Sequence, residues 1–168
     1  STGDMAPVCT SGCDMFSYQG THPRAQAPLV MGHEFSGVIE AGHPTLAKGT
    51  PVTVYPLLSC GQCEHCKNGT PHVCNTLKLI GIDCDGGMAE YVKVPADKVV
   101  EIPAGLNLKL GAFIEPVAVG VHAVRRSGYK PGDTAVVYGA GPIGLCVAAC
   151  LSYFGASRVI VIEANPYR

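Results

Sequence analysis

The sequence predicts a mixed fold in which a β-rich first part is followed by a βαβ unit. Between residues 30 and 103, short apolar and β-branched stretches alternate with Gly, Pro, Asn and Asp, which is typical of strands joined by turns. After residue 107 the pattern becomes helical, and an apolar strand, a glycine turn and a further helix follow. Hydrophobic residues make up 47% of the chain and charged residues 15%, with 21 Gly and 13 Pro, which favours a folded chain with many turns over a disordered chain or a coiled coil.

Four stretches in the first part are predicted to be strands. Each is rich in apolar or β-branched residues and is bounded by turn residues. Their spacing of roughly ten to fifteen residues favours a small barrel or sandwich over a doubly wound sheet. The stretches are residues 35–41, 51–55, 88–94 and 98–102.

The second part is predicted to begin with helix and to end in a parallel strand pair. Asn107 is a candidate cap for a helix over residues 108–113, which breaks at Pro116, resumes over 117–126 and ends at Gly128. The βαβ unit is predicted as a strand over 134–138, a helix over 142–154 and a strand over 158–162.

Charge and apolar runs exclude two classes of partner. With 12 basic and 13 acidic residues and a net charge of −1, the chain has no basic stripe for nucleic acid. Residues 134–157 carry no charge and are long enough to cross a membrane, but Gly139 and Pro142 would break such a helix near its middle. We therefore expect neither nucleic acid nor a membrane as partner.

Cysteine usage indicates a reducing compartment. The nine cysteines are odd in number, four of them cluster, and no signal peptide is recognisable. Metal thiolates fit this pattern better than a disulfide scaffold, and a cytoplasmic location is expected.

The densest motif is a loop with four cysteines at short spacing, Cys60, Cys63, Cys66 and Cys74. Four thiolates complete a tetrahedral zinc shell, so such a site is structural, and metal binding replaces a hydrophobic core. His65 and His72 lie within the loop and are competing candidate ligands. The alternatives are four unrelated cysteines or a zinc ribbon that contacts nucleic acid.

A second group is His33 and Glu34, which follow a turn, together with Glu115 about eighty residues later. An imidazole and carboxylates suit a catalytic zinc, at which three protein ligands leave one position open. The alternative is an ordinary surface or core role for each residue.

The third motif is Gly139-x-Gly141-x-x-Gly144 between a predicted strand and a predicted helix. In that context the glycines allow a tight turn and close approach of a pyrophosphate to the helix N-terminus. Glu163, at the end of the next strand, can accept hydrogen bonds from ribose hydroxyls and would repel a 2′-phosphate, which favours NAD over NADP. The alternative is a glycine turn that serves packing only.

Together these motifs resemble the zinc-dependent medium-chain alcohol dehydrogenases, and within them the polyol branch of sorbitol and threonine dehydrogenases. The resemblance implies a GroES-like β-barrel catalytic domain followed by a Rossmann domain. The stretches that carry it are 28–39, the cysteine lobe, 86–92, 114–122 and the glycine motif. On this basis residues 1–106 form the catalytic domain with a zinc lobe at 59–77, residues 107–130 link the domains, and residues 131–168 open the NAD-binding domain.

The resemblance also implies a reaction and a site. Hydride passes between a small secondary alcohol or polyol and NAD, with the substrate oxygen on a catalytic zinc. His33 and Glu115 match zinc ligands, Glu34 matches a residue that binds the metal or its water, and the whole enzyme would be a homodimer or tetramer. The implied cofactor-binding residues are Gly139, Gly141, Pro142, Ile143, Gly144, Glu163 and Arg168.

One departure concerns the catalytic position itself. Ser11 stands where the family has a zinc-binding cysteine, and Cys9 and Cys13 each lie two residues away, roughly 6–7 Å along an extended strand. Cys13 and Phe16 stand where the family has proton-relay groups. We therefore expect a weakened catalytic zinc, held by His33, Glu34, Glu115 and water, and one tightly bound zinc per chain.

The other departure is length. A nucleotide-binding sheet of this kind needs about six strands, and the chain ends after its second. The strand that usually precedes Pro7 is also missing. The sequence therefore predicts a fragment with little dehydrogenase activity alone, and it leaves open a truncated, non-catalytic zinc-binding relative.

Overall fold

The computed structural model describes residues 8–168. The chain divides into two compact units, with the boundary in the sequence between Phe113 and Ile114. The expectation about a strand before Pro7 lies outside the described residues. The predicted linking segment 107–130 contributes helix α3 (Leu108–Ala112) to the first unit and helix α4 (Ile114–Arg126) to the second.

The first unit is built on a four-stranded antiparallel sheet. Its strands are β1 (Val8–Cys9), β2 (Glu34–Val38), β3 (Pro51–Val54) and β6 (Val99–Glu101), hydrogen-bonded in the order β1-β2-β3-β6. Phe35 and Val54 form its core together with Ile80, which is 2% exposed. The strands predicted at 35–41, 51–55 and 98–102 are thus found, with slightly different ends.

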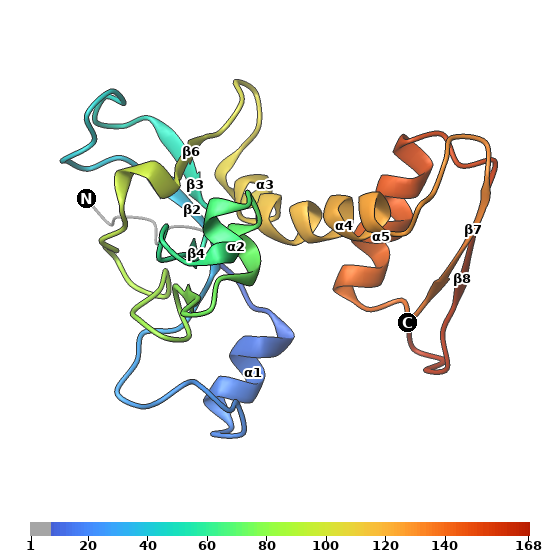
Figure 1. Cartoon of the computed structure of the whole chain (residues 1–168), viewed down its shortest axis with the longest axis horizontal. Coiled ribbons are helices and arrows are strands. Elements are labelled where there is room, and N and C mark those ends of the chain that lie inside the picture. Colours follow the sequence, from blue (N-terminus) through green and yellow to red (C-terminus); the bar gives the residue numbers. More distant parts are fainter. Residues whose placement is uncertain (1–7) are drawn as a thin grey trace. The chain divides into compact units, whose positions relative to one another are not determined.

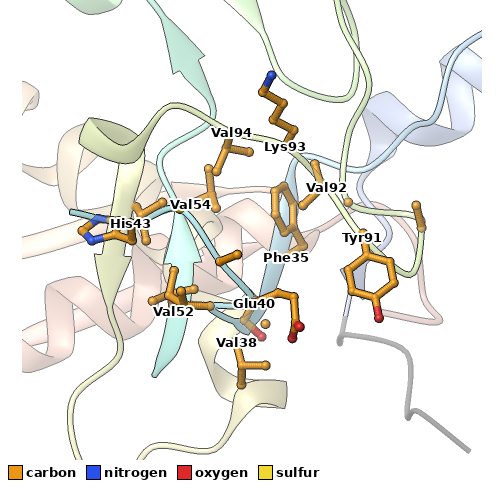
Figure 2. Close-up of a pocket in the computed structure, with 18 of the residues that line it drawn as sticks. Phe35, Val38, Glu40, His43, Val52, Val54, Tyr91, Val92, Lys93 and Val94 are labelled. Carbon is orange, nitrogen blue, oxygen red and sulfur yellow. The ribbon is translucent and has the colours of Figure 1, made fainter. Parts of the chain in front are cut away.

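The prediction of a strand at 88–94 was wrong, and the sheet does not close into a barrel within the described residues. The amides of Gly87 and Met88 bond to the carbonyl oxygens of Gly32 and Met31, but no ladder joins 89–94 to a strand in the described part of the chain. An alternating pattern makes a strand only where a neighbouring edge is available to pair with it. Beside the open sheet lies a pocket of about 460 Å³ (Figure 2). The residues that line it include Phe35, Val52, Val54, Val92 and Val94.

Several short elements of the first unit did not stand out in the sequence. Helix α1 (Gly12–Tyr18) follows β1, and the strand pair β4 (Leu57–Leu58) and β5 (Lys78–Leu79) frames the cysteine lobe. The lobe itself contains α2 (Glu64–Lys67) and the 3-10 turn η1 (Pro71–Val73), and a second such turn, η2 (Ala96–Lys98), precedes β6. These elements have two to seven residues, too few for an apolar period to show.

The second unit contains the predicted βαβ arrangement. Strands β7 (Thr134–Tyr138) and β8 (Arg158–Ile162) are parallel and in the predicted positions, and α5 (Pro142–Tyr153) connects them (Figure 1). Its core is formed by Val124 of α4, Val137 of β7 and two residues of α5, Cys150 and Leu151.

The predicted helix break at Pro116 was wrong. Asn107 does cap α3 by accepting a hydrogen bond from the Leu110 amide, 2.9 Å, but the interruption falls at Phe113. Pro116 lies in the first turn of α4, where its missing N–H costs no intrahelical hydrogen bond. Among the described residues, no helix is both long and apolar enough to span a bilayer.

Candidate metal centres and nucleotide loop

The cysteine lobe brings its four predicted ligands together. The sulfurs of Cys60, Cys63, Cys66 and Cys74 all lie within 4.8 Å of one another, and the shorter separations are 3.5, 3.8 and 3.9 Å. Four sulfurs that share one zinc at 2.3 Å would be about 3.8 Å apart, so the residues fit this metal. Neither His65 nor His72 belongs to this group of ligand atoms.

Backbone amides prepare part of this site for a thiolate. The Cys60 sulfur accepts hydrogen bonds from the amides of Gln62 and Cys63, 3.4 and 3.3 Å, and these lower its pKa to about 6. The pKa of Cys63 is also lowered, mainly by the Asn75 and Cys66 amides. Burial first, and then the neighbouring Cys63 sulfur, raises the pKa of Cys66 to about 11.

The second candidate centre is the turn that carries His33 and Glu34. Gly32 makes this turn at φ +95°, and a Cβ there would lie 2.9 Å from Met88 Cγ and 3.2 Å from Val8 Cγ1, so only glycine fits. His33 and Glu34 are each 6% exposed, and His33 Nε2 lies 4.0 Å from Glu34 Oε1. The structure thus brings these two predicted site residues together.

Asp14 is a site residue that the sequence analysis missed. It is 1% exposed, its Oδ1 lies 3.6 Å from His33 Nδ1, and the same oxygen accepts a hydrogen bond from the Gly32 amide at 3.2 Å. Burial alone would raise its pKa, but the nearby His33 side chain and the hydrogen bonds from the Ser11 amide and hydroxyl outweigh burial, so the pKa of Asp14 lies below its ordinary value. The available signal was Ser11 three residues before Asp14, the spacing of a reciprocal helix cap.

Ser11 is placed as the cap of α1. Its hydroxyl donates to Asp14 Oδ2 at 2.9 Å and accepts from the Asp14 amide at 3.1 Å, while its own amide donates to Asp14 Oδ2. A neutral hydroxyl whose proton is already donated is a poor zinc ligand compared with a thiolate. The residues around His33 therefore do not fit the thiolate-bound catalytic zinc that the resemblance implies. Glu115 lies in the first turn of α4, in the second unit.

The third candidate site is the loop after β7. Gly139 turns at φ +98°, and a Cβ at Gly144 would clash with the Gly139 carbonyl oxygen. Gly141 caps α5 in extended backbone, and Pro142 is its first residue, so the helix N-terminus starts directly at the loop, with Ile143 and Gly144 in its first turn.

Glu163 and Arg168 lie beside this loop. Glu163 accepts hydrogen bonds from the Ala140 amide, 2.8 Å, and the Asn165 amide, 2.7 Å. The amides of Asn165 and Ala140, and then the charge of Arg168, hold the pKa of Glu163 below its ordinary value. A Cβ on Gly141 would lie 3.5 Å from Arg168 Nη1. The fold thus collects most of the predicted nucleotide-binding residues at one end of the β7–β8 pair.

The chain thus has two parts, one with four clustered cysteine sulfurs and one with a glycine turn at the start of a helix. Residues 4–104 match the alcohol dehydrogenase GroES-like domain, and the chain belongs to that family.

Known proteins match nearly the whole chain in sequence and in structure. The chain is 41% identical over 169 residues to the 2-dehydro-3-deoxy-L-galactonate 5-dehydrogenase of Pseudoalteromonas atlantica, a match that covers 98% of this chain and 49% of the relative. A Sinorhizobium meliloti protein described as a zinc-binding dehydrogenase, solved with NADP, superimposes with a TM-score of 0.90 at 36% identity and covers 97% of this chain. An Escherichia coli alcohol dehydrogenase solved with NADH has a TM-score of 0.88 at 35% identity and covers 96%. The chain spans 48% and 49%, respectively, of these two solved chains, and about half the length of the curated relatives that it matches.

Proposed function

We propose that the protein is an oxidoreductase that transfers hydride between a small secondary alcohol or polyol and NAD, and that this chain supplies one zinc site and the first part of the nucleotide site. The observation that carries the proposal is the loop after β7, where the glycine turn, the start of α5 and Glu163 meet. The same chain holds a four-sulfur lobe, and its relatives are named dehydrogenases.

NAD would be held by the chain's own loop and strand ends. On this proposal the amides at the start of α5 would bind the pyrophosphate, and Glu163 would accept hydrogen bonds from the ribose hydroxyls. Bound NAD supplies the hydride acceptor. A carboxylate repels a 2′-phosphate, which favours NAD, although Arg168 lies near enough to offset part of this charge. On this proposal residues 131–168 open a Rossmann domain.

At the catalytic position we propose a weakly held metal. His33, Glu34 and Glu115 would be its protein ligands, with water completing the shell, while tight zinc binding is confined to the four cysteines. A non-catalytic zinc-binding relative is the second candidate function, and one observation favours it: the Ser11 hydroxyl is committed to Asp14.

The remaining parts of the proposal concern the whole protein. Relatives of twice this length act as dehydrogenases, so we propose that the chain alone has little activity and that the longer enzyme is a homodimer or tetramer. The small substrates in the names of the relatives favour a polyol or a sugar acid as the substrate of this protein. The nine cysteines, four of them clustered as metal ligands would be, favour a reducing compartment and hence the cytoplasm.

The test is NADH formation by the full-length protein that contains this sequence, assayed with a panel of polyols and sugar acids. The proposal predicts NAD-dependent oxidation that falls sharply in Glu163→Ala, and little turnover by residues 1–168 alone. Absence of turnover in a folded, zinc-loaded full-length protein would favour the non-catalytic relative. Polyol oxidation by the 168-residue chain would contradict the proposal that it is inactive alone.

A further inference from the structure

Position 11 lies beside the His33 turn. In the antiparallel pair β1–β2, Val8 is opposite Phe35 and Cys9 is opposite Glu34. Two further steps of this register would put Ser11 opposite Gly32, and Ser11 keeps extended backbone at φ −85° and ψ 168°. Since side chains alternate along extended backbone, position 11 faces the same side as Cys9, the partner of Glu34.

Asp14 ties position 11 to His33. One carboxylate oxygen holds the Ser11 amide and hydroxyl, both at 2.9 Å, and the other faces the Gly32 amide and His33 Nδ1. Asp14 Oδ1 and His33 Nδ1 are 3.6 Å apart, longer than a hydrogen bond, but an ionised carboxylate can only accept, so its position favours the imidazole tautomer with the proton on Nδ1. Nε2 then presents its lone pair on the side of Glu34, as a metal-binding histidine with a carboxylate partner does.

Two acceptors from nearly buried side chains, His33 Nε2 and Glu34 Oε1, lie 4.0 Å apart. Two such ligands on one tetrahedral zinc would be about 3.3 Å apart, so a small side-chain movement would bring both onto a shared cation. Their framework does not depend on the Ser11 hydroxyl. The Ser11 amide, the Gly32 amide and the packing of Met88 on Gly32 all remain if the side chain at position 11 changes.

We propose that Ser11 is a helix cap in the place of a metal ligand, and that His33 and Glu34, with Asp14 beside His33, keep positions from which they can ligate, so that the single change Ser11→Cys creates a thiolate-bound second site. This rests on the proposed function only through the matching of position 11 to a ligand position. The native chain then binds a divalent metal through thiolates at the cysteine lobe alone.

The test is Co²⁺ loading of the 168-residue chain, with metal counted per chain and thiolate-to-cobalt charge-transfer absorption recorded. We expect one thiolate-bound Co²⁺ in the native chain and two in Ser11→Cys, with the charge-transfer intensity higher by roughly one quarter because five thiolates replace four. His33→Ala in the Ser11→Cys background should return the count to one. Ser17→Cys is the matched control, because it adds a thiol about 1.7 turns along the same helix, where the hydroxyl bonds to the Cys13 carbonyl. This variant should leave the count at one.

A second variant at position 11 distinguishes a helix-capping role of Ser11 from a metal-binding role. Ser11→Ala should lower Tm, as loss of a helix cap does, and leave the metal count and the charge-transfer band unchanged. The proposal is overturned if folded Ser11→Cys still binds one Co²⁺, or if Ser11→Ala loses a metal. It is also overturned if the native chain already shows a fifth thiolate that Cys9→Ser or Cys13→Ser removes. Failure of the dehydrogenase assay would leave these counts untouched, so the two proposals fail separately.

Discussion

The buried carboxylate of Asp14 offers the sharpest test of how the first unit is held together. Asp14→Asn keeps the shape of the side chain but replaces one acceptor oxygen with a donor. Asp14 accepts three hydrogen bonds, from the Ser11 amide and hydroxyl on one oxygen and from the Gly32 amide on the other. The amide group can satisfy only one side, and a donor would then face another donor. At ~1.5–3 kcal/mol for a hydrogen bond to a charged group, with the opposed donors added, we expect a loss of about 3 kcal/mol, or roughly 10 °C in Tm.

The assay is urea unfolding of zinc-loaded native chain and Asp14→Asn at several pH values. The folded pKa of Asp14 lies below its ordinary 3.8, so its stabilisation is complete above that value and is lost as pH falls through the folded pKa. The stability difference between the two chains should therefore be full at pH 7 and shrink below about pH 4. Asp97→Asn is the control: this side chain is 71% exposed and pairs with Lys98, so a change within about 0.5 kcal/mol is expected. A difference below about 1 kcal/mol at pH 7, or one that widens on acidification, would refute the reasoning.

Three further predictions follow from the metal lobe and the nucleotide loop. Zinc uptake at pH 7 should release fewer than four protons, including one from Cys66, because the pKa of Cys60 is about 6 and that of Cys66 about 11; calorimetry in two buffers of different ionisation enthalpy measures this. Cys74→Ser or a strong chelator should open residues 59–77 to proteolysis while amide exchange in α5 stays slow. Gly144→Ala should lower the unfolding free energy of the second unit by ~2–3 kcal/mol and abolish measurable NAD binding, because its Cβ meets the Gly139 carbonyl oxygen; Gly12→Ala, whose Cβ meets nothing within 4 Å, is the control.

Features coded over a few adjacent residues could be predicted from the sequence. The strand, glycine turn and helix from Thr134 to Tyr153 follow from a β-branched run, the Gly139 turn and Pro142 at the helix start, which all act locally. The cysteine lobe is similar, because the spacing of its thiols already limits how one loop can surround an ion.

Features that depend on distant partners could not be predicted. The pattern at 88–94 is that of a strand, yet whether it pairs depends on an available edge, and the amides of Gly87 and Met88 are taken by the turn at Gly32. No apolar pattern in the sequence marks Asp14 as buried, and its role appears only when residue 14 meets residues 32 and 33. The same contact explains Ser11: its difference from the family was visible in the sequence, whereas the spacing of Ser11 and Asp14 was the one sequence signal of its use as a cap.

The zinc content of the purified 168-residue chain shows whether the four lobe cysteines hold the one tight metal site. We expect close to one zinc per chain after dialysis against a weak chelator, and none in a variant whose four lobe cysteines are all replaced by serine. That result would mean that the lobe binds metal through its four sulfurs and that Ser11 leaves the His33 turn without a tight site. Two equally tight zinc ions per native chain would contradict the account of Ser11, and a native chain that retains none would contradict the four-sulfur site itself.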